Sequence, residues 1–363
     1  MKINLIIFIS EFNLGGAGNS LFKLCKNLPK NKFHITIICL NKCYYKTDLL
    51  RNGIKVHEIN SSKTILGMPK IKKLVKSLIK SESKNIFLSN IYYSNILSIL
   101  FLRSLNIKIV IVERTPFQEL SIYYGIFDFV KKQIIKLLIG YTFKKADSCI
   151  SNSKYISQKY NENYKLKFKT INPPSFRKLF FFKKKRKKKS KICFGVVSRL
   201  SKEKKIHELI KILPELNNNP ILKIVGDGPE KKSLKILTEK LNLKKRVFFL
   251  GSHHPNSISS IMKKFDFLIN NSDFEGFPNS VVEAIGSGTP VIASQSFGGI
   301  NDIIINKNFG IIFNKKNDLK NTLNKILDRK INFRMNKNEI NNHLSKFSEK
   351  KNTESYKKLL LNL

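Results

Sequence analysis

The stretch that decides the fold covers residues 273–294 and reads Asp-Phe-Glu-Gly-Phe-Pro-Asn-Ser-Val-Val-Glu-Ala-Ile-Gly-Ser-Gly-Thr-Pro-Val-Ile-Ala-Ser. An apolar run at residues 267–269 precedes it, and the apolar residues 291–293 lie near its end; both runs have the length of a buried strand. Between them, Ser280 and Glu283 have the spacing of a capping box at a helix start. The sequence therefore predicts a strand, a loop, a short helix and a second strand.

The loop and the helix start are predicted to form a ligand site. Glu275 lies in the loop at the carboxyl end of the first strand, and Glu283 lies about one turn into the helix. In open parallel sheets, ligands bind at the carboxyl ends of the strands. The first backbone N–H groups of the helix, those of Asn279, Ser280 and Val281, are expected to be free and to suit a phosphate group.

The same stretch resembles the signature of a known family. Two glutamates separated by seven residues, in Glu275-Gly-Phe-Pro-Asn-Ser-Val-Val-Glu283, are similar to the motif of retaining glycosyltransferase family 4, whose members have the GT-B fold. The alternative is structural: Glu283 is only the capping partner, and Glu275 is only a solvated loop residue. Either glutamate alone fits that alternative, whereas the whole stretch favours the family.

The resemblance implies an α/β fold of two doubly wound, Rossmann-like domains that face a cleft. The second domain would hold a nucleotide sugar, for which a UDP-linked donor is expected, and the first would hold most of the acceptor. The implied reaction moves a hexose or N-acetylhexosamine, with retention of configuration, to a glycan or a lipid-linked acceptor. The implied setting is bacterial surface polysaccharide synthesis of the lipopolysaccharide or capsule type, with no cofactor and no metal ion.

The resemblance also assigns roles to single residues. Glu275 would contact the donor sugar near the reacting carbon as the catalytic residue, and Glu283 would accept hydrogen bonds from the ribose. Arg199 and Lys204 match the basic pair that holds the donor diphosphate, where fixed cations stabilise the charge that develops on the departing phosphate. The further donor-binding residues are Gly226, in a family-like turn, and the loop residues Gly276, Phe277, Pro278, Asn279 and Ser280.

The amino-terminal part of the chain begins with a similar pattern. Residues 2–10 form a nearly continuous apolar run, which is typical of a strand buried on both faces. Gly15 and Gly16 follow, and Asn19 and Ser20 can cap the next helix. A strand, a glycine loop and a helix can cradle a phosphate, although such turns are common. By the resemblance, Gly15 and Gly16 occupy the place that faces the donor diphosphate across the cleft.

A second charged motif lies at the end of the strand predicted for residues 107–112. Glu113 and Arg114 occupy the position where a parallel sheet offers residues to a ligand. Many family members carry a histidine near the acceptor in this half, and none can be assigned here. Glu113 and Arg114 are the best substitutes by position, and an ordinary ion pair within the loop is the alternative.

The chain of 363 residues is longer than a single core usually supports, so two domains are expected. Pro173 and Pro174 are a natural end to the first domain. The predicted parts are a first domain at 1–174, a basic linker at 175–190, a second domain at 191–340 and a carboxyl-terminal helix at 341–363 that returns to the first domain.

The chain is strongly basic, with 68 Lys+Arg against 25 Asp+Glu and a net charge of +43. Such an excess suggests a nucleic acid or an anionic membrane as partner. The lysines are dispersed, however, and no RNA-binding, zinc-finger or basic-zipper motif accompanies them, so no nucleic-acid partner is expected. The one charge block, Lys-Lys-Lys-Arg-Lys-Lys-Lys at residues 183–189, follows three phenylalanines. It reads as an exposed linker or as a segment that docks on anionic lipid.

Cysteines and apolar runs point to a cytoplasmic protein. The five cysteines lack metal-ligand spacing, and the adjacent His253 and His254 fit a solvated turn better than a ligand pair. The first apolar run is too short for a signal peptide, and the run at residues 91–102 is too short to span a bilayer. We therefore expect a location at the inner face of the membrane. The rival readings are a nucleotide-sugar epimerase of the same fold and a basic membrane-binding or nucleic-acid-binding protein.

Overall fold

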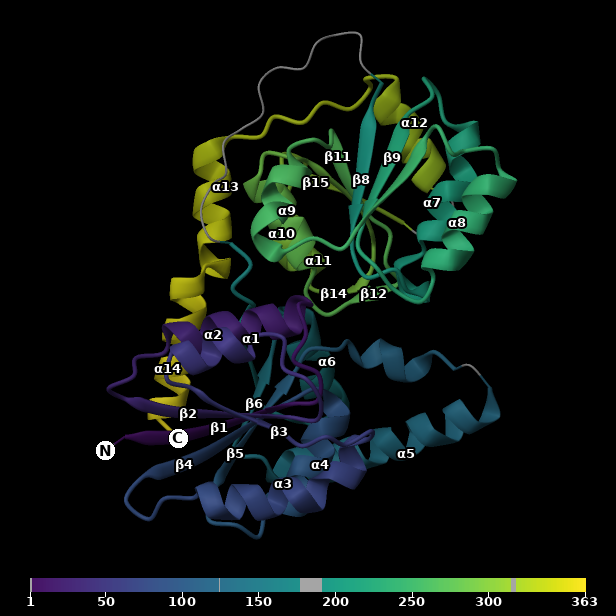
Figure 1. The fold of residues 1–363 in the computed structure, drawn as a ribbon. Helices are drawn as coiled ribbons and strands as arrows, with labels where there is room; N and C mark the ends of the chain where they lie inside the picture. The colour runs from purple at the N-terminus through teal and green to yellow at the C-terminus, as the bar shows by residue number, and fades with distance from the viewer. Residues whose placement is uncertain (1, 124, 177–190, 315–317) are drawn as a thin grey trace. The chain divides into compact units, whose positions relative to one another are not determined.

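The computed structural model describes residues 2–123, 125–176, 191–314 and 318–363 (Figure 1). The chain divides into two compact units. The first unit comprises Met1–Pro174 and Glu349–Leu363, and the second comprises Ser175–Ser348. The basic block at residues 183–189, and most of the linker expected at 175–190, lie outside the described residues.

The first unit is built on a seven-stranded parallel sheet in the order β3-β2-β1-β4-β5-β6-β7. Every residue of β1 is buried, which confirms the strand predicted from the first apolar run. The strand order reverses between β1 and β4, where sheets of this type bind ligands. The strands are β1 (Ile3–Ile9), β2 (Phe33–Cys39), β3 (Lys55–Glu58), β4 (Lys84–Asn90), β5 (Lys108–Glu113), β6 (Ser148–Ser151) and β7 (Phe168–Thr170).

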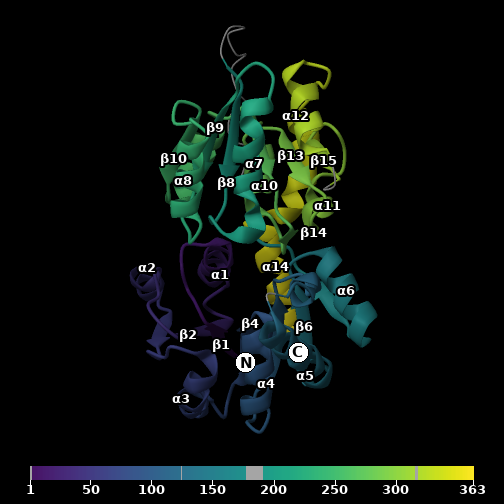
Figure 2. The ribbon, with the colours of Figure 1, turned by 90° about the vertical axis from the view of Figure 1, so that its right-hand side faces the viewer.

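Helices cover both faces of this sheet, as Figures 1 and 2 show. One core lies between the sheet and α1, α2 and α14, and the other lies between the sheet and α3, α4, α5 and α6. The helices are α1 (Gly16–Asn27), α2 (Lys46–Arg51), α3 (Thr64–Leu78), α4 (Tyr92–Leu102), α5 (Ile126–Thr142), α6 (Lys154–Tyr164) and α14 (Glu349–Leu361), with short 3-10 turns η1 (Phe117–Ser121) and η2 (Phe143–Lys145).

Helix α1 begins earlier than predicted. Its N-cap is Gly15, and the N–H of Asn19 already donates to the carbonyl oxygen of Gly15 at 2.9 Å. The hydroxyl of Ser20 donates to the carbonyl oxygen of Gly16 at 2.7 Å. Asn19 and Ser20 therefore lie inside the helix, and the predicted cap at these residues is wrong.

The second unit contains a six-stranded parallel sheet in the order β10-β9-β8-β11-β13-β15 and a small parallel pair, β12-β14. The order reverses between β8 and β11, so the strand that precedes the signature stretch lies at the reversal. The strands are β8 (Cys193–Val197), β9 (Ile221–Val225), β10 (Val247–Gly251), β11 (Phe267–Asn270), β12 (Phe274–Glu275), β13 (Val291–Ser294), β14 (Phe297–Gly298) and β15 (Gly310–Phe313).

Two helical layers complete this unit. Helices α9, α10, α11 and α13 enclose one core, and α7, α8 and α12 enclose the other (Figure 1). The helices are α7 (Ile206–Ile212), α8 (Lys231–Lys240), α9 (Pro255–Met262), α10 (Asn279–Gly286), α11 (Ile300–Ile303), α12 (Leu319–Leu327) and α13 (Lys337–Leu344), with 3-10 turns η3 (Lys202–Lys204), η4 (Leu213–Glu215) and η5 (Ser345–Phe347). Two doubly wound, Rossmann-like α/β units are thus confirmed.

The carboxyl-terminal segment differs from the single helix expected at residues 341–363. Helix α13 packs in the second unit, where Ile340 and Leu344 are buried, and η5 interrupts the helical run after it. Helix α14 packs in the first unit through Tyr356 and Leu360. The apolar residues before and after the interruption serve different cores, so the second unit extends to Ser348 and only α14 belongs to the first.

Candidate active site

The loops at the carboxyl ends of β8, β9, β11 and β13 converge in the second unit. The N–H of Leu200 donates to the carbonyl oxygen of Asp227 at 2.9 Å, which ties the first loop to the second. The N–H of Asp273 donates to the carbonyl oxygen of Glu203 at 2.8 Å, which ties the third loop to the first. The sheet thus gathers, at one edge, segments that lie far apart in the sequence.

Two glycines allow this convergence. Gly226 has a φ of +134°, and a Cβ there would lie 1.9 Å from the carbonyl oxygen of Ser198. Gly298 has a φ of +132°, and a Cβ there would lie 1.6 Å from the carbonyl oxygen of Glu275. Both positions combine a left-handed backbone with a close approach of another chain segment, so only glycine fits. Gly226 therefore shapes the turn in which the sequence placed a donor-binding residue.

The central feature of the site is an ion pair between Glu275 and Lys204. The ammonium of Lys204 donates to Oε2 of Glu275, and the two side chains are only 14% and 18% exposed. Lys204 ends η3, and Glu275 ends β12, whose pairing with β14 fixes the loop. Two residues that are 71 positions apart thus present a cation and a carboxylate at the carboxyl edge of the sheet.

A second ion pair lies in the same loops, and sequence reasoning missed it. Lys205 contacts Asp273 at 2.9 Å and Glu208 at 3.4 Å. Burial opposes the charged form of Lys205, but the hydrogen bond and attraction of Asp273 outweigh it, so the pKa of Lys205 is raised. Lys205 is therefore a paired lysine, whereas Lys202 in the same loop is exposed. The residues next to Lys205 in the sequence give no sign of its pairing with Asp273, which is distant in the chain.

Helix α10 differs at its start from the predicted capping box. It begins at Asn279 with Pro278 as N-cap, and no side chain caps it. Ser280 is therefore the second residue of the helix and does not cap it. The N–H of Val281 donates to the carbonyl oxygen of Pro278 at 3.0 Å, so it is not free as expected. The N–H groups of Asn279 and Ser280 remain without partners inside the helix, as in every first helical turn.

The other residues of the signature loop lie at different depths. Phe277 is buried and packs edge-on against Phe347 with a centroid distance of 5.1 Å, so its side chain supports the loop from the core. The side-chain oxygen of Asn279 accepts a hydrogen bond of 2.5 Å from Ser175. The carbonyl oxygen of Gly276 accepts a hydrogen bond of 3.1 Å from the N–H of Gly299. These contacts hold the backbone around Glu275 in place.

Arg199 precedes Lys204 in the chain, and Glu283 follows Glu275. Arg199 lies in the loop after β8 and is exposed, so its guanidinium is accessible to a ligand. Glu283 is the fifth residue of α10 and is half-buried, which confirms its predicted place about one turn into the helix. Its role in binding the ribose stays a prediction.

In the first unit, Gly15 and Gly16 lie at the start of α1, directly after the loop that follows β1. The N–H of Gly15 donates to Oδ1 of Asn13 at 3.0 Å. Both glycines therefore stand at the edge where the strand order of the first sheet reverses. This placement is compatible with a phosphate near the helix start, and the role stays a prediction.

Glu113 is fully buried at the end of β5. Its Oε1 accepts the N–H groups of Arg114 at 2.9 Å and Thr115 at 3.0 Å, and Oε2 has no partner among the described residues. Burial raises the pKa of this carboxyl to about 8, although the two N–H groups pull it the other way. Arg114 instead donates from Nε to Asn90 at 3.2 Å, so the described residues show no ion pair between the two neighbours.

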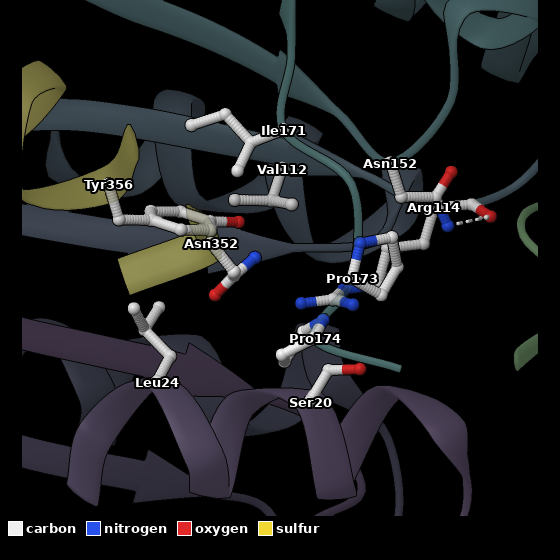
Figure 3. A pocket seen from close by; sticks show the side chains of 10 residues that line it. All are labelled: Ser20, Leu24, Val112, Arg114, Asn152, Ile171, Pro173, Pro174, Asn352 and Tyr356. Carbon is white, nitrogen blue, oxygen red and sulfur yellow. Dashed lines mark hydrogen bonds between the residues drawn. The ribbon is translucent and has the colours of Figure 1, made fainter. Parts of the chain in front are cut away.

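A small pocket lies beside Arg114 (Figure 3). Its volume is about 10 Å³, and residues of α1, β5, α14 and the segment before Pro174 line it. The side-chain oxygens of Asn152 and Asn352 have no partner among the described residues. A polar pocket of this size has room for about one water molecule and none for a sugar.

The described part of the chain contains no group of three or more His, Cys, Asp or Glu that could hold a metal ion. All five cysteines are buried and free. None of the helices that the structure describes is both long and apolar enough to cross a membrane.

Comparisons with known proteins identify the family. Residues 177–348 match the family model of glycosyl transferases group 1, and residues 14–172 match that of glycosyltransferase family 4. An N-acetylgalactosaminyltransferase of Campylobacter jejuni that acts on a diphospho-undecaprenol-linked sugar is 26% identical over 333 residues, 86% of each chain. Protein CapJ of Staphylococcus aureus is 33% identical over 49% of this chain, and the match spans only 44% of CapJ.

Solved structures show the same fold. HepE of Anabaena, in complex with UDP and glucose, has a TM-score of 0.79 and 19% identity, over 99% of this chain and 100% of HepE. Sucrose-phosphate synthase of Thermosynechococcus elongatus has a TM-score of 0.83 and 16% identity, over 99% of both chains. The two family models, which together span most of the chain, show that it belongs to the group 1 glycosyltransferases of family 4. The solved structures show that it has the GT-B fold.

Proposed function

We propose that this glycosyltransferase moves a hexose or N-acetylhexosamine from a UDP-linked donor to a lipid-linked or glycan acceptor, with retention of configuration. The observation that carries the proposal is the ion pair of Lys204 and Glu275 within the converging loops of the second unit. Support for the donor comes from HepE, whose structures hold UDP, UDP with glucose, or UDP-glucose. We propose UDP as the donor nucleotide because this chain has the fold of HepE.

Support for the acceptor comes from the names of relatives. The Campylobacter jejuni transferase acts on a sugar carried by diphospho-undecaprenol. A galactosyltransferase of Escherichia coli, 30% identical over 48% of this chain and 46% of its own length, acts on GlcNAc-diphosphoundecaprenol. We therefore propose that the acceptor here is also a sugar on a lipid carrier, extended during surface polysaccharide synthesis at the inner face of a membrane.

The side chains of the site suit glycosyl transfer. The bond between the anomeric carbon and the diphosphate oxygen breaks, and the electron pair stays on the diphosphate. Lys204, with the exposed Arg199, would stabilise that charge without a metal ion. The acceptor oxygen then bonds to the anomeric carbon on the same face, and its proton passes to the departing diphosphate oxygen. Glu275 would hold the sugar near the reacting carbon, and Glu283 would accept hydrogen bonds from the ribose.

A thermal-shift screen tests the proposal. A ligand that binds only the folded protein raises the melting temperature by mass action. UDP and at least one UDP-sugar should raise it, and the rise should be lost in Lys204→Ala and kept in Lys202→Ala. Stabilisation by guanosine-linked sugars alone would move the proposal to another nucleotide, and stabilisation by none would reject it. Conversion of the donor to another sugar without an acceptor would indicate an epimerase.

A further inference from the structure

Helix α5 of the first unit carries an apolar stripe on its exposed side. Phe127 is 90% exposed and Leu137 is 75% exposed, and four further residues of the stripe are also exposed. Monomeric soluble proteins rarely expose apolar side chains in a continuous row, so such a row marks an interaction surface. The stripe is formed by Ile126, Phe127, Val130, Ile134, Leu137 and Tyr141.

The spacing of the stripe is that of one helical face. From Phe127 to Tyr141 its members recur every three or four residues, and Ile126 adjoins the first of them. A different side of the same helix supplies the core of the first unit through the buried Ile135 and Ile139. The helix is thus apolar on two sides, and its own core requires only one of them.

Basic residues accompany the stripe. The segment 126–145 contains five lysines and a single acidic residue, Asp128. Asp128 is neutralised by Lys132 at 2.8 Å. Lys131, Lys144 and Lys145 are exposed. The face that exposes large apolar side chains therefore also bears positive charge. It suits a partner with an apolar interior and an anionic surface.

We infer that α5 is the element by which this protein binds an anionic membrane, with its stripe inserted at the boundary of head groups and acyl chains. An amphipathic helix with apolar side chains on one side and lysines beside them lies in the plane of such a surface. The inference rests on the proposed function for the reason why a membrane is near, because a lipid-linked acceptor lies there. It assigns the contact to α5 and not to the basic block at residues 183–189.

A second copy of the chain is a less suitable occupant. Two copies that met through this stripe would bring their lysines together, and like charges at close range repel. Each chain also carries a net charge of +43, which opposes self-association in general. With anionic lipid, both repulsions become attractions, because the exposed lysines beside the stripe and the net positive charge of the chain are drawn to the negative surface.

The test measures binding of the full chain to vesicles in the absence of any nucleotide sugar. Vesicles of phosphatidylcholine alone are compared with vesicles of phosphatidylcholine and phosphatidylglycerol in equal parts. Wild-type protein should bind the mixed vesicles and release as salt is added. The double variant Phe127→Ser, Leu137→Ser should bind them about tenfold or more weakly, since two large apolar side chains no longer enter the lipid.

The matched control is Ile236→Ser on α8, another lysine-rich helix, where Ile236 is 56% exposed. It should bind like wild type. Both variants alter exposed side chains, so their melting temperatures and their response to UDP should be unchanged. If UDP fails to stabilise the wild-type protein, the proposed function is contradicted. The vesicle result would still test the role of α5.

Three outcomes would overturn the inference. The double variant could bind the mixed vesicles as wild type does. Only replacement of the basic residues 183–189 by neutral polar residues could abolish binding, which would assign the membrane contact to that block. Alternatively, sedimentation could show a wild-type dimer that the double variant dissociates, with no vesicle binding by either, and the stripe would then be an interface between copies.

Discussion

Glu275 and Glu113 hold comparable positions in the two units, yet their surroundings give them opposite properties. Each lies at or just after the carboxyl end of a strand of a parallel sheet. Glu275 is partly exposed and paired with Lys204, whereas Glu113 is fully buried and bonded only to backbone N–H groups among the described residues. A cation favours the charged carboxylate, and burial favours the neutral carboxyl. The position at a strand end therefore does not decide the role of a glutamate; its partner and its burial do.

The largest expected effect follows from removing the charge of the paired glutamate. Glu275→Gln should lower turnover by a factor on the order of 10² or more, as for loss of a group that acts on developing charge. The measurement is release of UDP in the presence of acceptor, with thermal unfolding to check that the fold is retained. The matched variant is Glu113→Gln, which should keep turnover within a few-fold of wild type. Equal losses in the two variants would erase the contrast between the glutamates.

The cation of the pair should have the next largest effect. Lys204→Ala removes a charge-assisted contact worth about 1.5–3 kcal/mol, so the affinity for UDP should fall by roughly tenfold to a hundredfold. Titration calorimetry with UDP measures it. Arg199→Ala should act in the same direction, and Lys202→Ala should have no effect. If all three variants weaken binding alike, general surface charge explains the site and the ion pair does not.

Glu113 should make folding stability depend on pH. Its pKa is about 8 in the folded protein against an ordinary 4.5, so the folded state holds more protons between these values. The contribution of Glu113 to the free energy of unfolding is therefore fully present below pH 4.5 and is lost as pH rises toward 8, with a slope that approaches about 1.4 kcal/mol per pH unit. Urea unfolding of wild type and Glu113→Gln across this pH range isolates the contribution of Glu113 to the free energy of unfolding. Parallel curves for the two proteins would show that Glu113 is ionised in the folded state.

The smallest effect concerns a third glutamate, Glu283, which is half-buried within α10. Glu283→Gln should weaken UDP binding by about fivefold to tenfold, as for the loss of one hydrogen bond worth about 1 kcal/mol, and should leave turnover at saturating donor nearly unchanged. Thermal unfolding checks that the fold is retained. An unchanged affinity for UDP would remove Glu283 from the donor site.

Much of the architecture could be predicted from residues that act locally. The apolar runs that become β1, β11 and β13 have the composition of buried strands, and the structure confirms them. Local signals for helix starts were less reliable. The cap predicted at Asn19 and Ser20 lies within α1, and the box predicted at Ser280 lies within α10. A polar side chain near a helix start has the same local sequence whether the helix begins before it or after it.

Sequence by itself determined the order of strands and helices and the presence of the two signature glutamates, because these depend on neighbours along the chain. Only the tertiary structure decided which charges meet. Lys204 pairs with Glu275 across 71 positions, and Lys205 pairs with Asp273, because the parallel sheet brings separate loops to one edge. It also decided that Glu113 is buried and that the apolar stripe of α5 is exposed. Burial depends on which side of an element other elements cover, and periodicity within one element cannot show that.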